Sequence, residues 1–165
     1  MKYFLILVIS LSLLPAISSS NLLLDKTEFS LRGEALVEVT IFKIDVYIAK
    51  YYDSKKLDGL HLLELNYQID VERKHSLEGW SAGFKPLDIK KYEKSIEWIY
   101  DKTQDMKKGD SFSIWVKGSE VRFYLNNKLL AQVVDKDISD IAFFPWIGKE
   151  PLDEDIKKRL LGFKK

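Results

Sequence analysis

The residue types that most often carry out chemistry in proteins are few in this sequence. The two histidines, His61 and His75, stand in different segments, and neither has a carboxylate or second ligand at the spacing of a metal site. Asp153, Glu154 and Asp155 suggest acid-base chemistry or calcium, but the dipole at the start of a helix stabilises such acids without a ligand. We therefore predict no metal site and no cofactor.

Covalent and phosphate chemistry also lack their usual motifs. The sequence contains no cysteine, which excludes thiol chemistry and disulfide bonds. It has no Gly-x-Ser-x-Gly nucleophile elbow, and Lys149 follows Gly148 without the glycine-rich loop of a phosphate site. Because no complete catalytic set is present, we assign no catalytic residue.

The first twenty residues, 1–20, have the pattern of a secretory signal peptide. A positive charge at Lys2 precedes an apolar run from Phe4 to Leu14, and small residues follow. This run is too short to span a bilayer core of about 30 Å. A buried N-terminal strand is the alternative. We predict cleavage after Ser18 or Ser20, a periplasmic or secreted protein, and no integral membrane segment after cleavage.

The remaining residues, 21–165, are enough for a single domain with its own core, and no linker or repeat divides them. Removal of the signal peptide takes away Lys2, so the formal net charge falls from +1 to 0. This balance argues against nucleic acid or an anionic membrane surface as the main partner. The oligomeric state stays undetermined.

Alternating apolar residues predict strands at the beginning of the domain. After Gly33, which is expected to mark a turn, residues 35–52 are rich in Val, Ile, Thr and Tyr. Their apolar positions change parity near Phe42 and Lys43, which predicts two strands or one bulged strand. Residues 61–71 alternate cleanly and predict a half-buried strand, with Glu64 on its polar face.

The rest of the domain combines helices with a second group of strands. Three strands joined by turns are predicted from Phe112 to Val133. The predicted helices are residues 76–84 capped by Ser76, 88–106 opened by Asp88, 138–143 capped by Asp135 or Asp137 and ended by Pro145, and a last helix from Asp153. Hairpins followed by helices indicate an α+β domain whose antiparallel sheet is covered by helices on one face.

Five segments are the most distinctive part of the chain: residues 42–52, 79–84, 107–110, 124–130 and 144–162. The last begins with Phe-Pro-Trp-Ile-Gly and ends with Leu-Leu-Gly. In sequence and in order they resemble the chalcone isomerase-like family, in particular its bacterial exported branch. The resemblance implies an open-faced β-sandwich, with a large antiparallel sheet, a helical layer and an apolar cleft between them. In the family this cleft takes fatty acids in non-enzymatic members and chalcones in the plant enzymes.

The resemblance also implies which residues face the cleft. Tyr47 matches the strand position that holds a catalytic threonine in the plant enzymes and usually a tyrosine in bacterial members. Tyr92 matches the tyrosine that donates a hydrogen bond in the plant site, and Trp146 falls among cleft-lining residues. Ordinary packing is the alternative for each of the three: a buried strand tyrosine, a core residue on a helical stripe, and a side chain that locks the turn beside Pro145.

The family arginine, which stabilises negative charge in the plant reaction, has no counterpart at the expected position. Val37 or Val39 stands there, and Arg32 and Lys43 are the nearest cations in sequence. A lysine would be a weaker substitute because it lacks the planar guanidinium. This difference argues more strongly against the isomerase reaction than against ligand binding.

We therefore predict an exported, non-catalytic protein that binds a fatty acid or another small amphipathic ligand in an apolar cleft. The candidate ligand-binding residues are Tyr47, Tyr92, Trp146, Lys43 and Arg32. An isomerase or intramolecular lyase acting on an enone-like substrate, with Lys43 or Arg32 replacing the arginine, is the first alternative. An envelope interaction module whose cleft is filled by aromatic side chains is the second.

Overall fold

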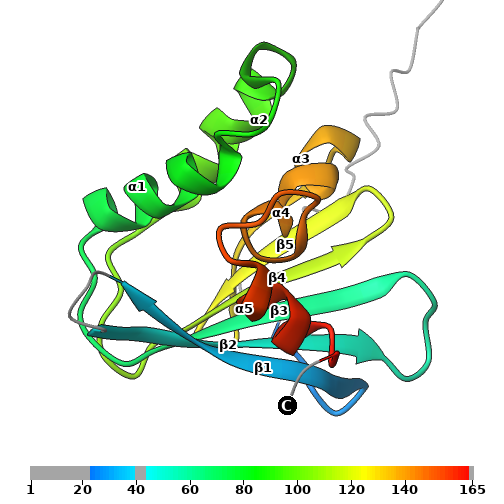
Figure 1. Ribbon diagram of the computed structural model, residues 1–165. Helices are drawn as coiled ribbons and strands as arrows, with labels where there is room; N and C mark the ends of the chain where they lie inside the picture. Colours follow the sequence, from blue (N-terminus) through cyan, green and yellow to red (C-terminus); the bar gives the residue numbers. More distant parts are fainter. Residues whose placement is uncertain (1–22, 40–43, 164–165) are drawn as a thin grey trace, which may run out of the picture.

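Six strands form one antiparallel sheet in which every strand pairs with its neighbours in sequence (Figure 1). The computed structural model describes residues 23–39 and 44–163. Its strands are β1 (Phe29–Val39), β2 (Ile44–Ser54), β3 (Leu60–Tyr67), β4 (Ser111–Lys117), β5 (Glu120–Leu125) and β6 (Lys128–Val134). The predicted α+β class with an antiparallel sheet is confirmed.

The first strand differs from its prediction at Gly33. This glycine pairs with Tyr51 in the middle of β1 and does not mark a turn. A Cβ atom there would lie 2.0 Å from the carbonyl oxygen of Arg159, so only glycine lets the end of the last helix approach the strand this closely. The parity change that predicted two strands falls on residues 42 and 43, outside the described residues. The strands on either side of it are separate, which agrees with the first of the two predicted alternatives.

The third strand is shorter than the sequence pattern suggested. It ends at Tyr67, and Val71 forms an isolated bridge with Met106 through two backbone hydrogen bonds of 2.8 Å each. The three later strands occupy the predicted segments. Asn126 and Asn127 have φ values of 52° and 65° between β5 and β6, which suits the tight turns that join twisted hairpins.

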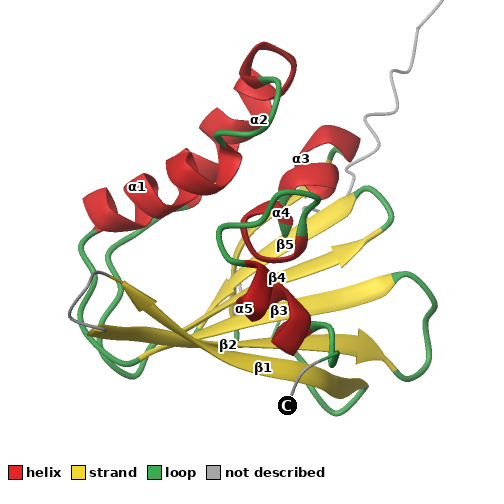
Figure 2. Cartoon of the chain, viewed as in Figure 1, coloured by secondary structure: helices red, strands yellow, loops and turns green. Residues whose placement is uncertain are grey.

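The described residues contain five helices, and all lie on the same side of the sheet (Figure 2). They are α1 (Arg73–Phe84), α2 (Ile89–Lys102), α3 (Lys136–Ile141), α4 (Phe144–Ile147) and α5 (Glu154–Leu160). Helices α1 and α2 follow β3 and precede β4 in the sequence, and together they form an arm that rises away from the sheet in Figure 1. Helix α5 lies over β1. Among the described residues, no helix has the length and apolar character needed to cross a bilayer.

Several predicted helix ends needed correction. Helix α1 begins at Arg73 after Glu72, so Ser76 lies inside the helix and does not cap it. Helix α2 begins after Asp88 as predicted, but it ends at Lys102, before Met106. Pro145 does not end a helix: it lies in the first turn of α4, where a missing backbone N–H is tolerated.

The caps of the two remaining helices agree with the sequence. Asp135 accepts a hydrogen bond of 2.9 Å from the Ile138 backbone nitrogen at the start of α3. Asp153 accepts from the backbone nitrogens of Asp155 and Ile156 at the start of α5. Both satisfy donors that the helix itself leaves unpaired.

The main core fills the space between the sheet and the helices, and a small second cluster lies on the opposite face. This cluster consists of Phe29, Leu60, Leu62, Trp115 and Tyr124. Leu24, from the lead-in segment that precedes β1 (residues 23–28), packs against it.

Glu64 is also covered on this opposite face, contrary to the prediction of a solvated polar face. It is only 6% exposed and pairs with Lys26, because the lead-in segment crosses the sheet there.

Candidate functional site

A cavity of about 660 Å³ lies between helix α1 and the sheet, closed at one side by α4 and α5. Its volume is within the range of roughly 300–1,000 Å³ that is usual for small-molecule sites. Most of its wall is apolar: Leu65 and Phe112 come from the sheet, Trp80 from α1, and Ile156 from α5. This cavity occupies the place of the cleft that the family resemblance implied.

An irregularity in the first two strands turns extra side chains toward the cavity. The β1–β2 register shifts between Val37 and Glu38, so that Val37 pairs with Tyr47 and Glu38 pairs with Asp45. Val46 is left without a partner at this bulge, and both Val46 and Tyr47 line the cavity. The bulge thus gives two successive residues to one face of the sheet.

Tyr47 and Trp146 meet at the cavity wall, although they are far apart in sequence. The Trp146 indole Nε1 donates a hydrogen bond of 3.0 Å to the Tyr47 hydroxyl. The Trp146 ring is 7% exposed and packs edge-on against Trp80, with 5.1 Å between ring centroids. Because the Tyr47 oxygen accepts this hydrogen bond, its own O–H proton remains available to a ligand.

A second tyrosine and a serine extend this polar part of the wall. The rings of Tyr47 and Tyr67 lie 5.5 Å apart. The buried Ser76 Oγ has no hydrogen-bond partner of good geometry, although it lies close enough to the Tyr67 hydroxyl to lower its pKa slightly against a larger increase caused by burial. Burial also raises the pKa of Tyr47 to about 12. At neutral pH both phenols are therefore uncharged hydrogen-bond donors.

The rim of the cavity is acidic. Glu38, Asp70, Glu78 and Asp153 contribute carboxylates to its lining, and His75 contributes an imidazole. The His75 ring nitrogen lies 3.0 Å from a Glu78 oxygen. Among the described residues that line the cavity, none is lysine or arginine.

The predicted site residues divide into those that reach the cavity and those that do not. Tyr47 and Trp146 line it together. Tyr92 does not: it lies on α2, where its hydroxyl accepts a hydrogen bond of 2.8 Å from Lys91 Nζ and its half-buried ring packs against the main core. The apolar stripe that placed Tyr92 on a helix also explains its packing role.

Neither predicted cation contributes to the described lining. Arg32 lies on β1, where its Nε donates to the Leu161 carbonyl at 3.2 Å and its guanidinium lies 3.4 Å from Asp53. It ties the end of α5 to the sheet. Lys43 lies outside the described residues. Val37, one of the two residues that stand where the family arginine is expected, lines the cavity.

Sequence reasoning missed three lining residues as members of the site. Tyr67 belongs to the alternating inner set of β3, so its direction was predicted but its place in a cavity was not. Ser76 was interpreted as a helix cap, and Trp80 was only placed on a helix. A tryptophan flanked by the small residues Gly79, Ser81 and Ala82 is the sequence signal that could have found this wall.

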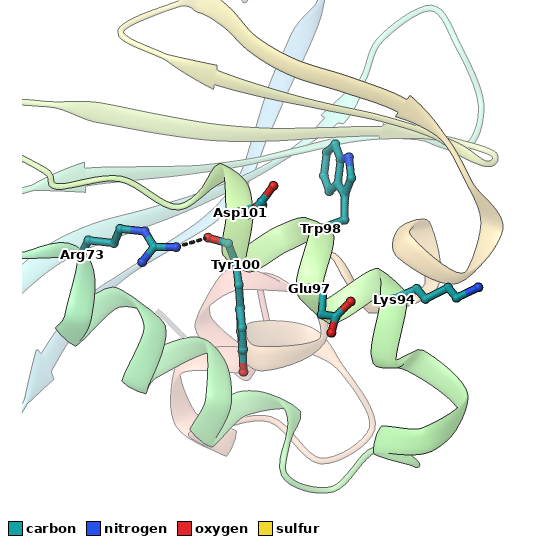
Figure 3. Close-up of a pocket in the computed structure, with 6 residues that line it drawn as sticks. All are labelled: Arg73, Lys94, Glu97, Trp98, Tyr100 and Asp101. Atoms are coloured by element: carbon teal, nitrogen blue, oxygen red, sulfur yellow. Dashed lines mark hydrogen bonds between the residues drawn. The ribbon is translucent and has the colours of Figure 1, made fainter.

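A second hollow, of about 520 Å³, lies on α2 and is lined by Arg73, Lys94, Glu97, Trp98, Tyr100 and Asp101 (Figure 3). Four of these six side chains are charged. The Arg73 guanidinium donates to the carbonyl oxygens of Tyr100 at 3.0 Å and Thr103 at 2.9 Å, at the C-terminal end of α2. Arg73 therefore caps a helix end here, and the hollow offers little surface to an apolar ligand.

No group of three or more His, Asp or Glu side chains among the described residues is arranged to hold a metal ion. Local pairing accounts for acids at the cavity rim. Asp70 accepts from Lys107 Nζ at 3.0 Å and from the Lys108 backbone nitrogen at 2.8 Å, which holds the pKa of Asp70 below its ordinary value. Asp153 is occupied as the cap of α5.

Comparisons with known proteins find a matching family and a solved structure of similar fold. Residues 18–162 match a family model described as chalcone isomerase-like. A crystal structure of a fatty-acid binding protein from Arabidopsis thaliana is similar, with a TM-score of 0.65 and 12% sequence identity over 83% of this chain and 88% of that chain. At this identity the likeness shows a shared fold. The search of curated protein sequences found no match.

Proposed function

Because the chain belongs to the chalcone isomerase-like family, we propose that it is a non-catalytic binding protein that holds a small, largely apolar ligand between α1 and the sheet. The observation that carries this proposal is the cavity of about 660 Å³, with its apolar wall and its fixed Tyr47–Trp146 pair. The shared fold with a protein described as fatty-acid binding is consistent with it.

The physical basis of binding would be simple. Apolar contact with the wall contributes roughly 25 cal/mol per Å² of surface removed from water. A few fixed polar groups then orient the ligand, and the Tyr47 hydroxyl is the best placed because Trp146 already holds its oxygen. No proton transfer or covalent step is needed.

An isomerase acting on an enone-like substrate is less well supported. That reaction needs a fixed cation or strong donors where negative charge develops. The described lining contains neither lysine nor arginine, and Arg32 is engaged with Leu161 and Asp53. A cleft filled by aromatic side chains, the second alternative, is also disfavoured because the cavity has room for a ligand.

We also propose that the protein is exported and that residues 1–20 are removed as a signal peptide. The charge at Lys2, the short apolar run and the small residues after it support this proposal. Intact mass spectrometry of the protein recovered from its host tests it: a mature chain beginning at Ser19 or Asn21 is expected. A chain that retains its first residues would contradict it.

Ligand binding is tested by native mass spectrometry and lipid extraction of the purified protein, followed by titration with a neutral fluorescent apolar probe. We expect a bound small molecule or saturable probe binding. Ala82→Trp places bulk at the cavity wall and should weaken probe binding at least about tenfold. Ser81→Trp adds the same bulk to an exposed position outside the lining and should leave binding unchanged. No extracted ligand and no probe binding in repeated preparations would refute the proposal.

A further inference from the structure

Among the described residues, the charged side chains that line the cavity are carboxylates, with His75 as the only basic group. The carboxylates of Glu38, Asp70, Glu78 and Asp153 lie in its lining, and no described lining residue is lysine or arginine. An anion that entered would give up its hydration without gaining a lysine or arginine from the described lining, which is the costly case for a buried charge.

Nearby cations are already engaged. Lys107 Nζ pairs with Asp70 at 3.0 Å, and Lys157 Nζ donates to the Gly148 carbonyl at 2.7 Å. His75, the one described lining side chain that can carry a positive charge, lies 3.0 Å from Glu78 on the same helix. Each of these basic groups is therefore already paired with a carboxylate or a carbonyl oxygen.

The cavity wall offers uncharged hydrogen-bonding groups instead. The Tyr47 oxygen accepts from Trp146, which leaves its O–H to donate toward the cavity. Tyr67 lines the same wall, its ring 5.5 Å from that of Tyr47. The Ser76 hydroxyl is buried without a hydrogen-bond partner of good geometry. A ligand oxygen would complete this set of groups.

We propose that the ligand is an uncharged amphiphile whose hydroxyl or carbonyl oxygen accepts a hydrogen bond from Tyr47, and that the cavity excludes ionised carboxylates. The inference rests on the proposed binding function and narrows its ligand class. It departs from the expectation of a fatty acid, because the described lining lacks the cation that would hold a carboxylate.

The test compares ligands with the same twelve-carbon chain and different head groups. Dodecan-1-ol, methyl dodecanoate and dodecanoate each displace a neutral fluorescent probe from the purified mature protein at low ionic strength. At about pH 8 we expect the alcohol and the ester to bind at least about tenfold more tightly than the ionised acid. This difference should narrow toward about pH 5, because protonation removes the charge of the ligand.

Histidine is the side chain that most often changes charge between pH 5 and 8, so the series is repeated in His75→Gln. The difference in affinity between the uncharged ligands and dodecanoate should narrow in the same way in this variant, because it is the carboxyl group of the ligand that takes up the proton. Narrowing that disappears in His75→Gln would assign the pH dependence to the histidine and overturn this part of the inference. The carboxylates of Glu38, Asp70, Glu78 and Asp153 and the phenols of Tyr47 and Tyr67 are the other titratable groups of the lining.

A charge reversal tests the role of the rim directly. Glu78→Lys should strengthen dodecanoate binding by about threefold or more relative to dodecan-1-ol binding in the same variant. Glu93→Lys makes the same change at an exposed position of α2 outside the lining and should alter neither. Dodecanoate binding as tight as the alcohol at about pH 8 would overturn the inference but leave the binding function intact. If no ligand or probe binds, both proposals fail.

Discussion

The helical layer meets the sheet in two different ways at its two ends. At the closed end, α5 lies directly on β1, and a Cβ atom on Gly33 would come within 2.0 Å of the Arg159 carbonyl oxygen. At the hollow end, α1 borders the cavity, and a Cβ atom on Gly79 would have no atom within 4 Å. The same layer is therefore in backbone contact at one end and open at the other.

The two ends of the helical layer differ in the size of the side chains that lie between the helices and the sheet. Small residues bring backbones together at the closed end, whereas aromatic side chains keep elements apart at the hollow end. Trp80 packs edge-on against Trp146, and Tyr47 supports Trp146 from the sheet. Gly83, where a Cβ would lie 2.5 Å from the Pro145 Cβ, joins α1 to α4 between the two regions. A cavity can persist in a stable domain because neighbouring contacts fix its walls.

The largest expected effect is the contrast between two glycine substitutions. Gly33→Ala should lower the free energy of unfolding by about 3 kcal/mol, because the new methyl group must displace the backbone of α5. Gly79→Ala should raise it by about 0.5–1 kcal/mol, because alanine favours the helix and meets only open space. Urea unfolding followed by circular dichroism measures both. Equal effects at the two positions would remove the distinction between the ends.

The next effect concerns ligand affinity. Tyr47→Phe removes the donor at the cavity wall and should weaken binding of dodecan-1-ol by about tenfold, close to the upper range for one hydrogen bond. Tyr51 lies on the same strand, is 4% exposed and does not line the cavity. Tyr51→Phe should therefore leave affinity unchanged. Probe displacement measures both variants, and equal losses would show that Tyr47 acts only through general packing.

A smaller effect is expected from two buried serines. Ser76→Ala removes from α1 a hydroxyl that has no hydrogen-bond partner of good geometry. It should stabilise the fold by about 0.5–1 kcal/mol while weakening the binding of an oxygen-bearing ligand. Ser113 has an unpaired Oγ as well, but it lies outside the cavity lining. Ser113→Ala should change stability alone. Thermal unfolding with and without dodecan-1-ol separates the two outcomes, and identical ligand responses would contradict the assignment of Ser76 to the site.

The smallest expected effect of the ligand should appear in alkaline solution. Burial raises the pKa of both Tyr47 and Tyr51 to about 12, so the folded state favours their neutral forms. The resulting stability is complete below about pH 10, the pKa of an unfolded tyrosine, and is lost as the pH rises toward 12. Ligand in the cavity should raise the Tyr47 pKa further and leave Tyr51 unchanged. Phenolate absorbance of the Tyr47→Phe and Tyr51→Phe variants with and without dodecan-1-ol tests this, and an equal ligand shift in both would contradict it.

The sequence predicted the sheet well because its strands depend on local alternation. In β4 the inner residues Phe112, Ile114 and Val116 are all buried, and every strand pairs with its neighbour in sequence. Pro145 was misjudged because the same residue can stop one helix or open another, and only the surrounding chain decides. The helical layer on one face was also predicted correctly.

Long-range contacts could not be derived from the pattern. Gly33 was expected to mark a turn because nothing in its neighbourhood shows that the backbone of Arg159 will pack on it. Glu64 alternates like a solvated residue, and its burial depends on Lys26 crossing the sheet. The family resemblance predicted Tyr47 and Trp146 at the cavity wall. The acidic rim could not be predicted, because its carboxylates come from segments as far apart in sequence as β1, α1 and the start of α5.

The isolated bridge between Val71 and Met106 has a wider consequence for how this protein can change. Its two backbone hydrogen bonds close the base of the helical arm, so β3 and β4 are held in register below it. The entropy of closing a loop depends only weakly on its length. We therefore expect that insertions or deletions in the arm can remodel the roof of the cavity while the sheet keeps its pairing, as long as core residues of the arm such as Trp80 and Phe84 are retained. Changes confined to the helical arm could therefore alter which ligand the cavity binds without altering the sheet.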